Sequence, residues 1–230
     1  VEGQATNRVT SISVRAEKTT VIPGGNTMLQ TEVYGEGTLS KKVRYSCEQG
    51  EEWLKTFYKT EEEALEGAHT ESKIGWFQLK LDTPVGTELI FKSTSLDDES
   101  KTDTVTVTVV EPDELKSYEI VAPEGYEILH ETTDVIEVQA GTKLQLSSRA
   151  ETSGNYQWKA VWSTPWTKDA AGDKTSGELK ATISTDGEVT VPEGLGAGST
   201  IRILLKPEAG DVGLAEGVPT SKAVVLRVVE

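Results

Sequence analysis

The sequence predicts an all-β fold, arranged as two β-sandwiches in series. Apolar and polar residues alternate along many short segments, most clearly at residues 104–109, where three valines fall on one face. Thr (29), Val (23) and Gly (21) are abundant, and these residues suit strands and the turns between them. Segments that combine a turn with a strand also recur in the two halves, so the two sandwiches are expected to share one plan.

The domain boundary is expected at Pro112. The alternating strand ends in residues 110–114, where a proline and three acids break the pattern before alternation resumes. The same ending recurs at residues 223–230, as expected if each half closes with an equivalent strand. These observations predict domains at residues 1–112 and 113–230.

Two further repeats support this division. The glycine turn and strand at residues 21–30 match those at 138–146, and the turn and strand at 81–91 match those at 195–203. The turn glycines of the two segments are 61 residues apart in the first half and 57 in the second. Such similar spacing predicts that the same strands occupy the same places in both sandwiches.

Helix is scarce in this pattern. One short helix is expected at residues 61–68, because Thr60 can cap it and the acids that follow stabilise its positive end. A helix of this length is marginal without tertiary packing.

The repeated segments resemble the bacterial immunoglobulin-like domains of group 2, which occur in tandem in surface adhesins of the intimin and invasin type. That family has a glycine turn before a Leu- and Thr-rich strand, a Val-x-Trp-Ser-like core strand, a glycine-containing hairpin and a Gly-Thr turn. The matching segments are residues 24–30, 43–46, 141–146, 161–163, 181–191 and 198–201.

The resemblance implies immunoglobulin-like sandwiches in both halves, with Trp162 at the core position of the second. In the first half Tyr45 stands where the family has tryptophan, and residues 48–75 form an insertion that the family pattern does not contain. Trp53, Phe57 and Tyr58 in this insertion are spaced like one face of a short helix. They are expected to pack on their own sandwich, with a partner-binding patch as the alternative.

The densest aromatic group lies in the second half. Tyr156, Trp158 and Trp162 fall on one face of a strand, so they are expected to face the core. Trp166 lies in the Gly- and Asp-containing stretch from Thr164 to Gly177 and is expected at the surface. Tryptophans exposed together would instead provide a platform for sugar rings, which leaves a carbohydrate-binding module as an alternative.

Other motifs have ordinary structural interpretations. Asp186-Gly187 predicts a type I′ hairpin turn. Residues 194–198 contain three glycines, but a strand follows them where a dinucleotide site needs a helix. The acids at 61–63 and 97–99 lack the spacing of a calcium loop and are expected on a solvated face and in a turn between strands.

The charge excludes some partners. Lys and Arg (23) are outnumbered by Asp and Glu (38), giving a net charge of −15, which disfavours nucleic acid. No apolar run is long enough for direct membrane insertion, and the N-terminus lacks a signal peptide, so the chain is expected to be a processed or excised fragment. Cys47 cannot form an intrachain disulfide and is expected to be a small buried hydrophobic residue.

The sequence gives no indication of an enzyme. It contains no nucleophile elbow, no zinc-binding histidine pair and no Cys-x-x-Cys. Its two histidines, His69 and His130, are expected to be ordinary surface residues. No catalytic, metal-binding or cofactor-binding residue is therefore assigned, no cofactor is expected, and ligand-binding residues are not identified.

The residues and the resemblance together favour a non-enzymatic module of a bacterial cell-surface or secreted protein. It would be extracellular and monomeric, acting as a stalk or spacer or as an adhesion module for a host protein or carbohydrate. Contact with a ligand would use the residues at 48–75 or the loop at 164–177, because loops carry function on rigid scaffolds. An immunoglobulin-like decoration domain of a phage tail or capsid is the other alternative.

Overall fold

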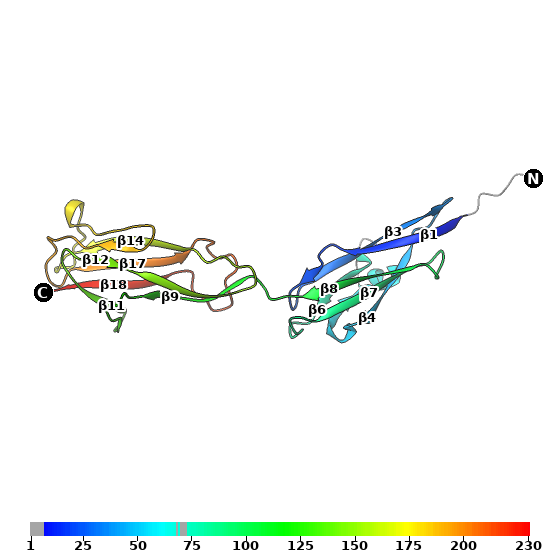
Figure 1. The fold of residues 1–230 in the computed structure, drawn as a ribbon, viewed down its shortest axis with the longest axis horizontal. Coiled ribbons are helices and arrows are strands. Elements are labelled where there is room, and N and C mark those ends of the chain that lie inside the picture. Colours follow the sequence, from blue (N-terminus) through cyan, green and yellow to red (C-terminus); the bar gives the residue numbers. More distant parts are fainter. Residues whose placement is uncertain (1–6, 68, 70–72) are drawn as a thin grey trace, which may run out of the picture. The chain divides into compact units, whose positions relative to one another are not determined.

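The computed structural model describes residues 7–67, 69 and 73–230 (Figure 1). The chain divides into two compact units, unit 1 (residues 1–112) and unit 2 (residues 113–230). Each unit is built from short strands arranged in packed sheets, which confirms the all-β, immunoglobulin-like prediction.

Unit 1 contains eight strands and one α-helix in its described residues. The strands are β1 (Arg8–Ala16), β2 (Thr20–Val21), β3 (Asn26–Glu36), β4 (Val43–Gln49), β5 (Leu54–Phe57), β6 (Trp76–Leu79), β7 (Glu88–Ser95) and β8 (Thr102–Val109). The helix is α1 (Glu61–Glu66), and a 3₁₀ turn (Glu51–Trp53) precedes β5.

These strands form two four-stranded sheets. One has the order β1-β3-β6-β5 and is antiparallel throughout, and the other has the order β2-β8-β7-β4, in which β2 runs parallel to β8. Apart from the short β2, this is the strand order of the constant-type immunoglobulin sandwich. The core between the sheets confirms the packing, since Phe77 from one sheet stacks 4.5 Å from Phe91 of the other, with both rings fully buried.

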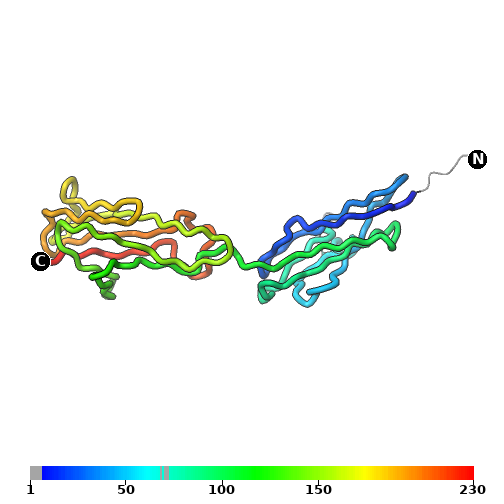
Figure 2. The backbone as a smooth tube through the Cα atoms, in the orientation of Figure 1, coloured from blue at the N-terminus to red at the C-terminus, as the bar shows by residue number. Residues whose placement is uncertain are grey.

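Unit 2 repeats this arrangement. Its strands are β9 (Glu114–Val121), β10 (Leu129–His130), β11 (Asp134–Gln139), β12 (Lys143–Gln145), β13 (Ser147–Ser153), β14 (Ala160–Lys168), β15 (Thr182–Ile183), β16 (Glu188–Thr190), β17 (Thr200–Pro207) and β18 (Lys222–Val229). Figure 2 follows the backbone through them, from green at β9 to red at β18.

A five-stranded sheet with the order β10-β11-β18-β17-β14 forms one layer of unit 2, and β11 runs parallel to β18 over five residue pairs. The other layer consists of β9 paired with β13 and of β12-β16-β15. Leu146 separates β12 from β13, and its amide donates to the carbonyl of Gly187 (3.0 Å), so the two strands continue one another. The core of unit 2 lies between these layers and includes Ile136, Leu144 and Ile203.

The structure corrects the predicted helical face at Trp53, Phe57 and Tyr58. Residues 54–57 form β5, an edge strand paired with β6, and Trp53 ends the 3₁₀ turn. Phe57 packs edge-on against Phe91 (5.4 Å), so burial of this ring favours an extended backbone over the helical spacing. Part of the segment expected as an insertion is therefore a strand of the sandwich.

Two local predictions have mixed outcomes. The hairpin between β15 and β16 lies at Asp186-Gly187 as predicted, but only Gly187 has positive φ (92°), so the turn is not type I′. The Gly187 amide donates to the Ser184 carbonyl (3.1 Å), and the Ser184 amide donates to Glu188 (2.9 Å), which is a type I turn followed by a glycine bulge. The glycine-rich residues 194–198 lead into β17, as predicted.

The predicted helix is confirmed as α1, which ends at Glu66; Ala68 lies outside the described residues. The Thr60 side chain accepts a hydrogen bond from the Glu63 amide (3.3 Å), as expected of an N-cap. Within the described part of the chain, no helix has the length and apolarity needed to cross a bilayer.

Candidate functional site

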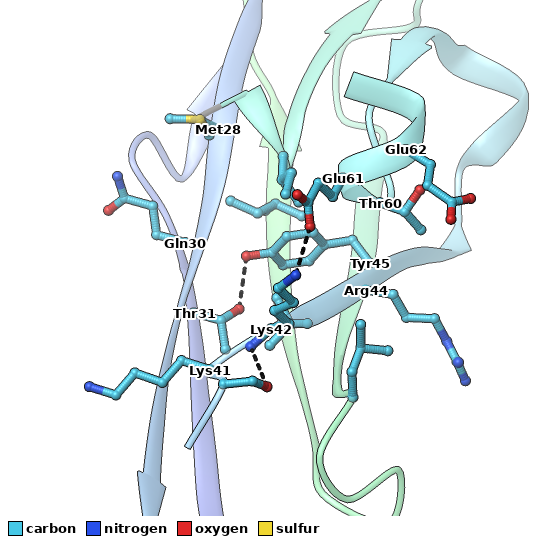
Figure 3. Close-up of a pocket in the computed structure, with 15 residues that line it drawn as sticks. Met28, Gln30, Thr31, Lys41, Lys42, Arg44, Tyr45, Thr60, Glu61 and Glu62 are labelled. Atoms are coloured by element: carbon cyan, nitrogen blue, oxygen red, sulfur yellow. Dashed lines mark hydrogen bonds and ion pairs between the residues drawn. The ribbon is translucent and has the colours of Figure 1, made fainter. Parts of the chain in front are cut away.

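A groove of about 780 Å³ opens on the side of unit 1 (Figure 3). Its walls come from residues 28–31 of β3, residues 40–45 of β4 and the loop before it, residues 60–62 at the start of α1, and Ile74 and Leu96. This volume falls within the range of small-ligand sites.

The groove exists because β6 is much shorter than β3. β6 pairs with residues 26–28 of β3, and the Leu29 amide still bonds to Gly75 (2.9 Å). After Leu29, β3 still pairs with β1 on its opposite edge. Among the described residues, no strand pairs with its other edge there. The other edge of β3 therefore borders the groove.

Hydroxyl groups line the inner part of the groove. The Thr31 hydroxyl lies 2.9 Å from the Tyr45 hydroxyl and 2.8 Å from that of Ser93 (Figure 3 shows the first contact). Burial raises the pKa of Tyr45, and the hydrogen bond with Thr31 opposes this only in part. The tyrosine is therefore a neutral, hydrogen-bonded core residue, not an activated one.

The rim of the groove is ionic. Lys42 extends from the loop before β4 to α1, where its ammonium lies 3.2 Å from the Glu61 carboxylate (Figure 3). The Thr60 cap and a hydrogen bond from the Lys59 amide to Glu63 (2.8 Å) position α1 here. Lys41 next to it has a left-handed backbone (φ 58°), which L-residues adopt at a cost.

The acids at 97–99 form a turn between β7 and β8, as predicted. The Ser95 hydroxyl accepts from the Asp97 and Asp98 amides (3.2 and 3.3 Å), and Glu99 pairs with Arg44 (2.8 Å). Hydrogen bonds from Ser100 lower the pKa of Asp98. Neither these acids nor any other described His, Cys, Asp or Glu residues form a group of three suited to a metal ion.

In unit 2, the core prediction is confirmed for all three aromatic residues for which it was made. Tyr156, Trp158 and Trp162 pack against the buried cluster. The Trp158 indole donates to the Ser148 hydroxyl (3.1 Å), and its ring lies 5.3 Å from that of Tyr118. These contacts remove Trp158 from any sugar platform.

Trp166 lies outside the buried cluster, as expected, but in strand β14 instead of a loop. The register of β14 with β17 shifts after Ser163, which pairs with Leu204, and resumes with Trp166 opposite Arg202. This bulge places Trp166 on the outer face of the five-stranded sheet, because the following Thr167 pairs with the buried Ile201. The Lys168 ammonium lies 4.4 Å from the centre of the Trp166 ring.

Cys47, His69 and His130 make ordinary structural or surface contacts. Cys47 is half-buried, and burial raises its pKa to about 11. His130 is exposed, with its Nδ1 2.7 Å from the Asp134 carboxylate across the β10–β11 hairpin. His69 is exposed, and its ring lies 5.1 Å from the ring of Tyr58.

The groove was not predicted, and neither was the place of Trp166 within a strand, although its surface position was. The groove depends on where β6 ends, and the position of Trp166 depends on the bulge. The strand-breaking Pro165 next to Trp166 was the one local signal for that bulge.

No family model matches the chain, and no curated protein matches it either. Solved structures do match. The Yersinia pseudotuberculosis adhesin InvE aligns with a TM-score of 0.33 at 10% identity, covering 96% of this chain and 60% of that chain. Domains 4 and 5 of the S-layer protein SbsC align with a TM-score of 0.35 at 14% identity, covering 96% of this chain and 99% of that chain.

Three N-terminal domains of the bacteriophage RB49 outer capsid protein Hoc align with a TM-score of 0.42 at 10% identity, covering 96% of this chain and 71% of that chain. The alignment with InvE covers 60% of the InvE chain, so this chain spans less than two thirds of it. At such scores and identities, these likenesses do not extend to activity or partners.

Proposed function

We propose that the chain is a non-enzymatic, tandem immunoglobulin-like module of a bacterial cell-surface or secreted protein, acting as a spacer or an adhesion module. The observation that supports it is one shared feature of both units. In each, an early strand pairs in parallel with the last strand, β2 with β8 in unit 1 and β11 with β18 in unit 2.

A parallel pair between an early strand and the last strand suits a domain under tension. Pulling on the N-terminal side of the early strand and the C-terminal side of the last strand moves the two strands in opposite directions along their axes. The evenly spaced hydrogen bonds of a parallel pair then share the load, whereas a pair pulled open from one end breaks its bonds in sequence. A spacer that holds a binding site away from a cell experiences this kind of force.

Composition supports a monomeric module. The net charge of −15 favours solubility and opposes self-association, as expected of a monomeric module. In the groove of unit 1, Thr31 is hydrogen-bonded to Tyr45 and Lys42 is ion-paired with Glu61, so the groove suits a binding site better than a catalytic one.

Protease shaving of intact source cells tests the location. Trypsin releases the peptide at residues 74–80 by cleaving after Lys73 and after Lys80, and mass spectrometry identifies it. We expect this peptide in the supernatant of unbroken cells, with a cytosolic marker protein absent as the control. Recovery only after lysis would contradict a surface location, and recovery from purified phage particles would favour a virion component instead.

A further inference from the structure

The outer face of the five-stranded sheet in unit 2 carries an unusual set of side chains. Strand register aligns Trp166 of β14 with Arg202 of β17, and Arg202 with Val225 of β18. The next row contains Lys168, Thr200 and Arg227. An aromatic ring and several cations therefore lie together on neighbouring strands, whose order Figure 1 shows.

The charge of this face opposes that of the chain. Its outward positions on β11, β14, β17 and β18 hold one acid, Glu137, and four cations: Lys168, Arg202, Lys206 and Arg227. In a chain with 38 acids and 23 bases, this is a local reversal of sign. A cationic face on an acidic chain indicates an anionic partner.

Most of these cations are not neutralised within the protein. Arg227 pairs with Glu131 (2.7 Å) and Glu137 (3.7 Å). No carboxylate of the described residues lies within 4 Å of the charged nitrogens of Lys168, Arg202 or Lys206 on this face. Lys168 instead rests over the ring of Trp166.

Unit 1 provides an internal comparison. The equivalent face of its β2-β8-β7-β4 sheet presents a row of threonines on β8, at 102, 104, 106 and 108. Its cations are Arg44, which is paired with Glu99 (2.8 Å), and Lys92, and it has no outward tryptophan. The aromatic and cationic face is therefore a property of unit 2 and not of the shared fold.

We propose that this face of unit 2 binds an anionic polysaccharide. The guanidinium of Arg202 binds a carboxylate or sulfate group through two hydrogen bonds, and a sugar ring packs on Trp166. Lys168 leaves the ring to bind a second acidic group, which uncovers the aromatic surface. Cations on strands about 4.8 Å apart suit a polymer with charges repeated along its length.

The inference deepens the adhesion role and rests on the proposed function. The two can fail separately, because the shaving experiment reports only the location of the protein and the binding experiment reports only the ligand. Binding is measured on the 230-residue chain by calorimetry at a fixed salt concentration. The probes are heparin, which carries sulfate, and alginate, which carries only carboxylate, with neutral dextran as the control. Binding to either polyanion supports the proposal and identifies the acidic group.

Four variants test the site. We expect Arg202→Gln and Trp166→Leu each to weaken binding at least tenfold, while Lys92→Gln, which removes one cation from the equivalent face of unit 1, changes it less than twofold. Circular dichroism of each variant checks that the fold is kept, and Trp166→Tyr, which keeps an aromatic ring, is expected to retain most of the affinity.

Three outcomes would overturn the proposal. The first is no binding of either polyanion. The second is an equal loss in Lys92→Gln and Arg202→Gln, which indicates unspecific charge attraction. The third is equally tight binding of poly-L-glutamate with the same dependence on Trp166, which indicates an acidic protein as the partner.

Discussion

Gly86 and Gly198 occupy the same position in the two units. Both have a left-handed backbone, with φ of 91° and 89°. The amide of each donates a 2.8 Å hydrogen bond to a carbonyl of the last strand of its own unit, Val109 and Val228. The internal repeat therefore extends to individual backbone hydrogen bonds, at a turn where glycine avoids the steric cost that other residues incur.

Replacing either glycine by alanine is expected to destabilise its unit. Gly86→Ala should lower the free energy of unfolding by about 1–2 kcal/mol, the cost of a left-handed L-residue. Gly198→Ala should cost somewhat more, because an added Cβ would lie 3.3 Å from Ala170. Urea unfolding of the whole chain measures both. Gly196→Ala is the matched control, since its Cβ meets no atom within 4 Å, and a comparable loss there would contradict this explanation.

Lys41 is the one non-glycine residue with positive φ in the described ranges 7–67, 69 and 73–230. Lys41→Gly relieves this strain but increases the entropy of the unfolded chain, so we expect a net stabilisation of about 0.5 kcal/mol. Lys42→Gly relieves no strain and should destabilise by a similar amount, since it also breaks the ion pair with Glu61. Equal effects of the two substitutions in urea unfolding would argue against strain at Lys41.

The cap of α1 is expected to hold the rim of the groove. Thr60→Ala removes the acceptor for the Glu63 amide and should destabilise the helix by about 1 kcal/mol. Hydrogen exchange should accelerate at the Ala64 and Gly67 amides, which bond within this turn. Thr60→Ser keeps the acceptor and should leave exchange nearly unchanged; faster exchange there would show that the methyl group matters more than the cap.

The Cys47 thiol should react slowly. Burial raises its pKa from 9.0 to about 11, and the thiolate is the reactive form. At pH 8, alkylation by iodoacetamide should therefore be about a hundredfold slower than in the unfolded chain, and it should keep rising with pH up to about 11. A rate that levels off near pH 9 would contradict the burial effect.

The same shift affects stability. Because the folded pKa is raised, the contribution of the protonated thiol is fully present below pH 9 and is lost as the pH rises through about 11. Comparing Cys47→Ala with the native chain across this range isolates the contribution of this group, since the variant should lack that part of the pH dependence.

The sequence predicted the features that depend on local pattern. Alternation located β8 and β18, glycine turns located the starts of β3 and β17, and the Thr60 cap located α1. Each of these signals lies within about ten residues of the element that it predicts. The alternating strands are reliable signals because a strand with one buried face and period two has a single register.

Features that depend on distant residues were missed. Phe57 lies in a strand because it packs on Phe91, and no pattern near residue 57 indicates this contact. Trp166 was expected at the surface, but its place in β14 depends on a bulge that shifts the register with β17, which is a property of two strands together. The groove likewise depends on where β6 stops pairing with β3.

Stretching single molecules from their two ends tests the central claim most directly. The five parallel pairs between β11 and β18, against two between β2 and β8, predict two unfolding peaks, the stronger from unit 2. Gly86→Ala identifies the unit 1 peak by lowering it alone. Extension without force peaks, or a stronger peak from unit 1, would contradict a module whose parallel strand pairs resist tension.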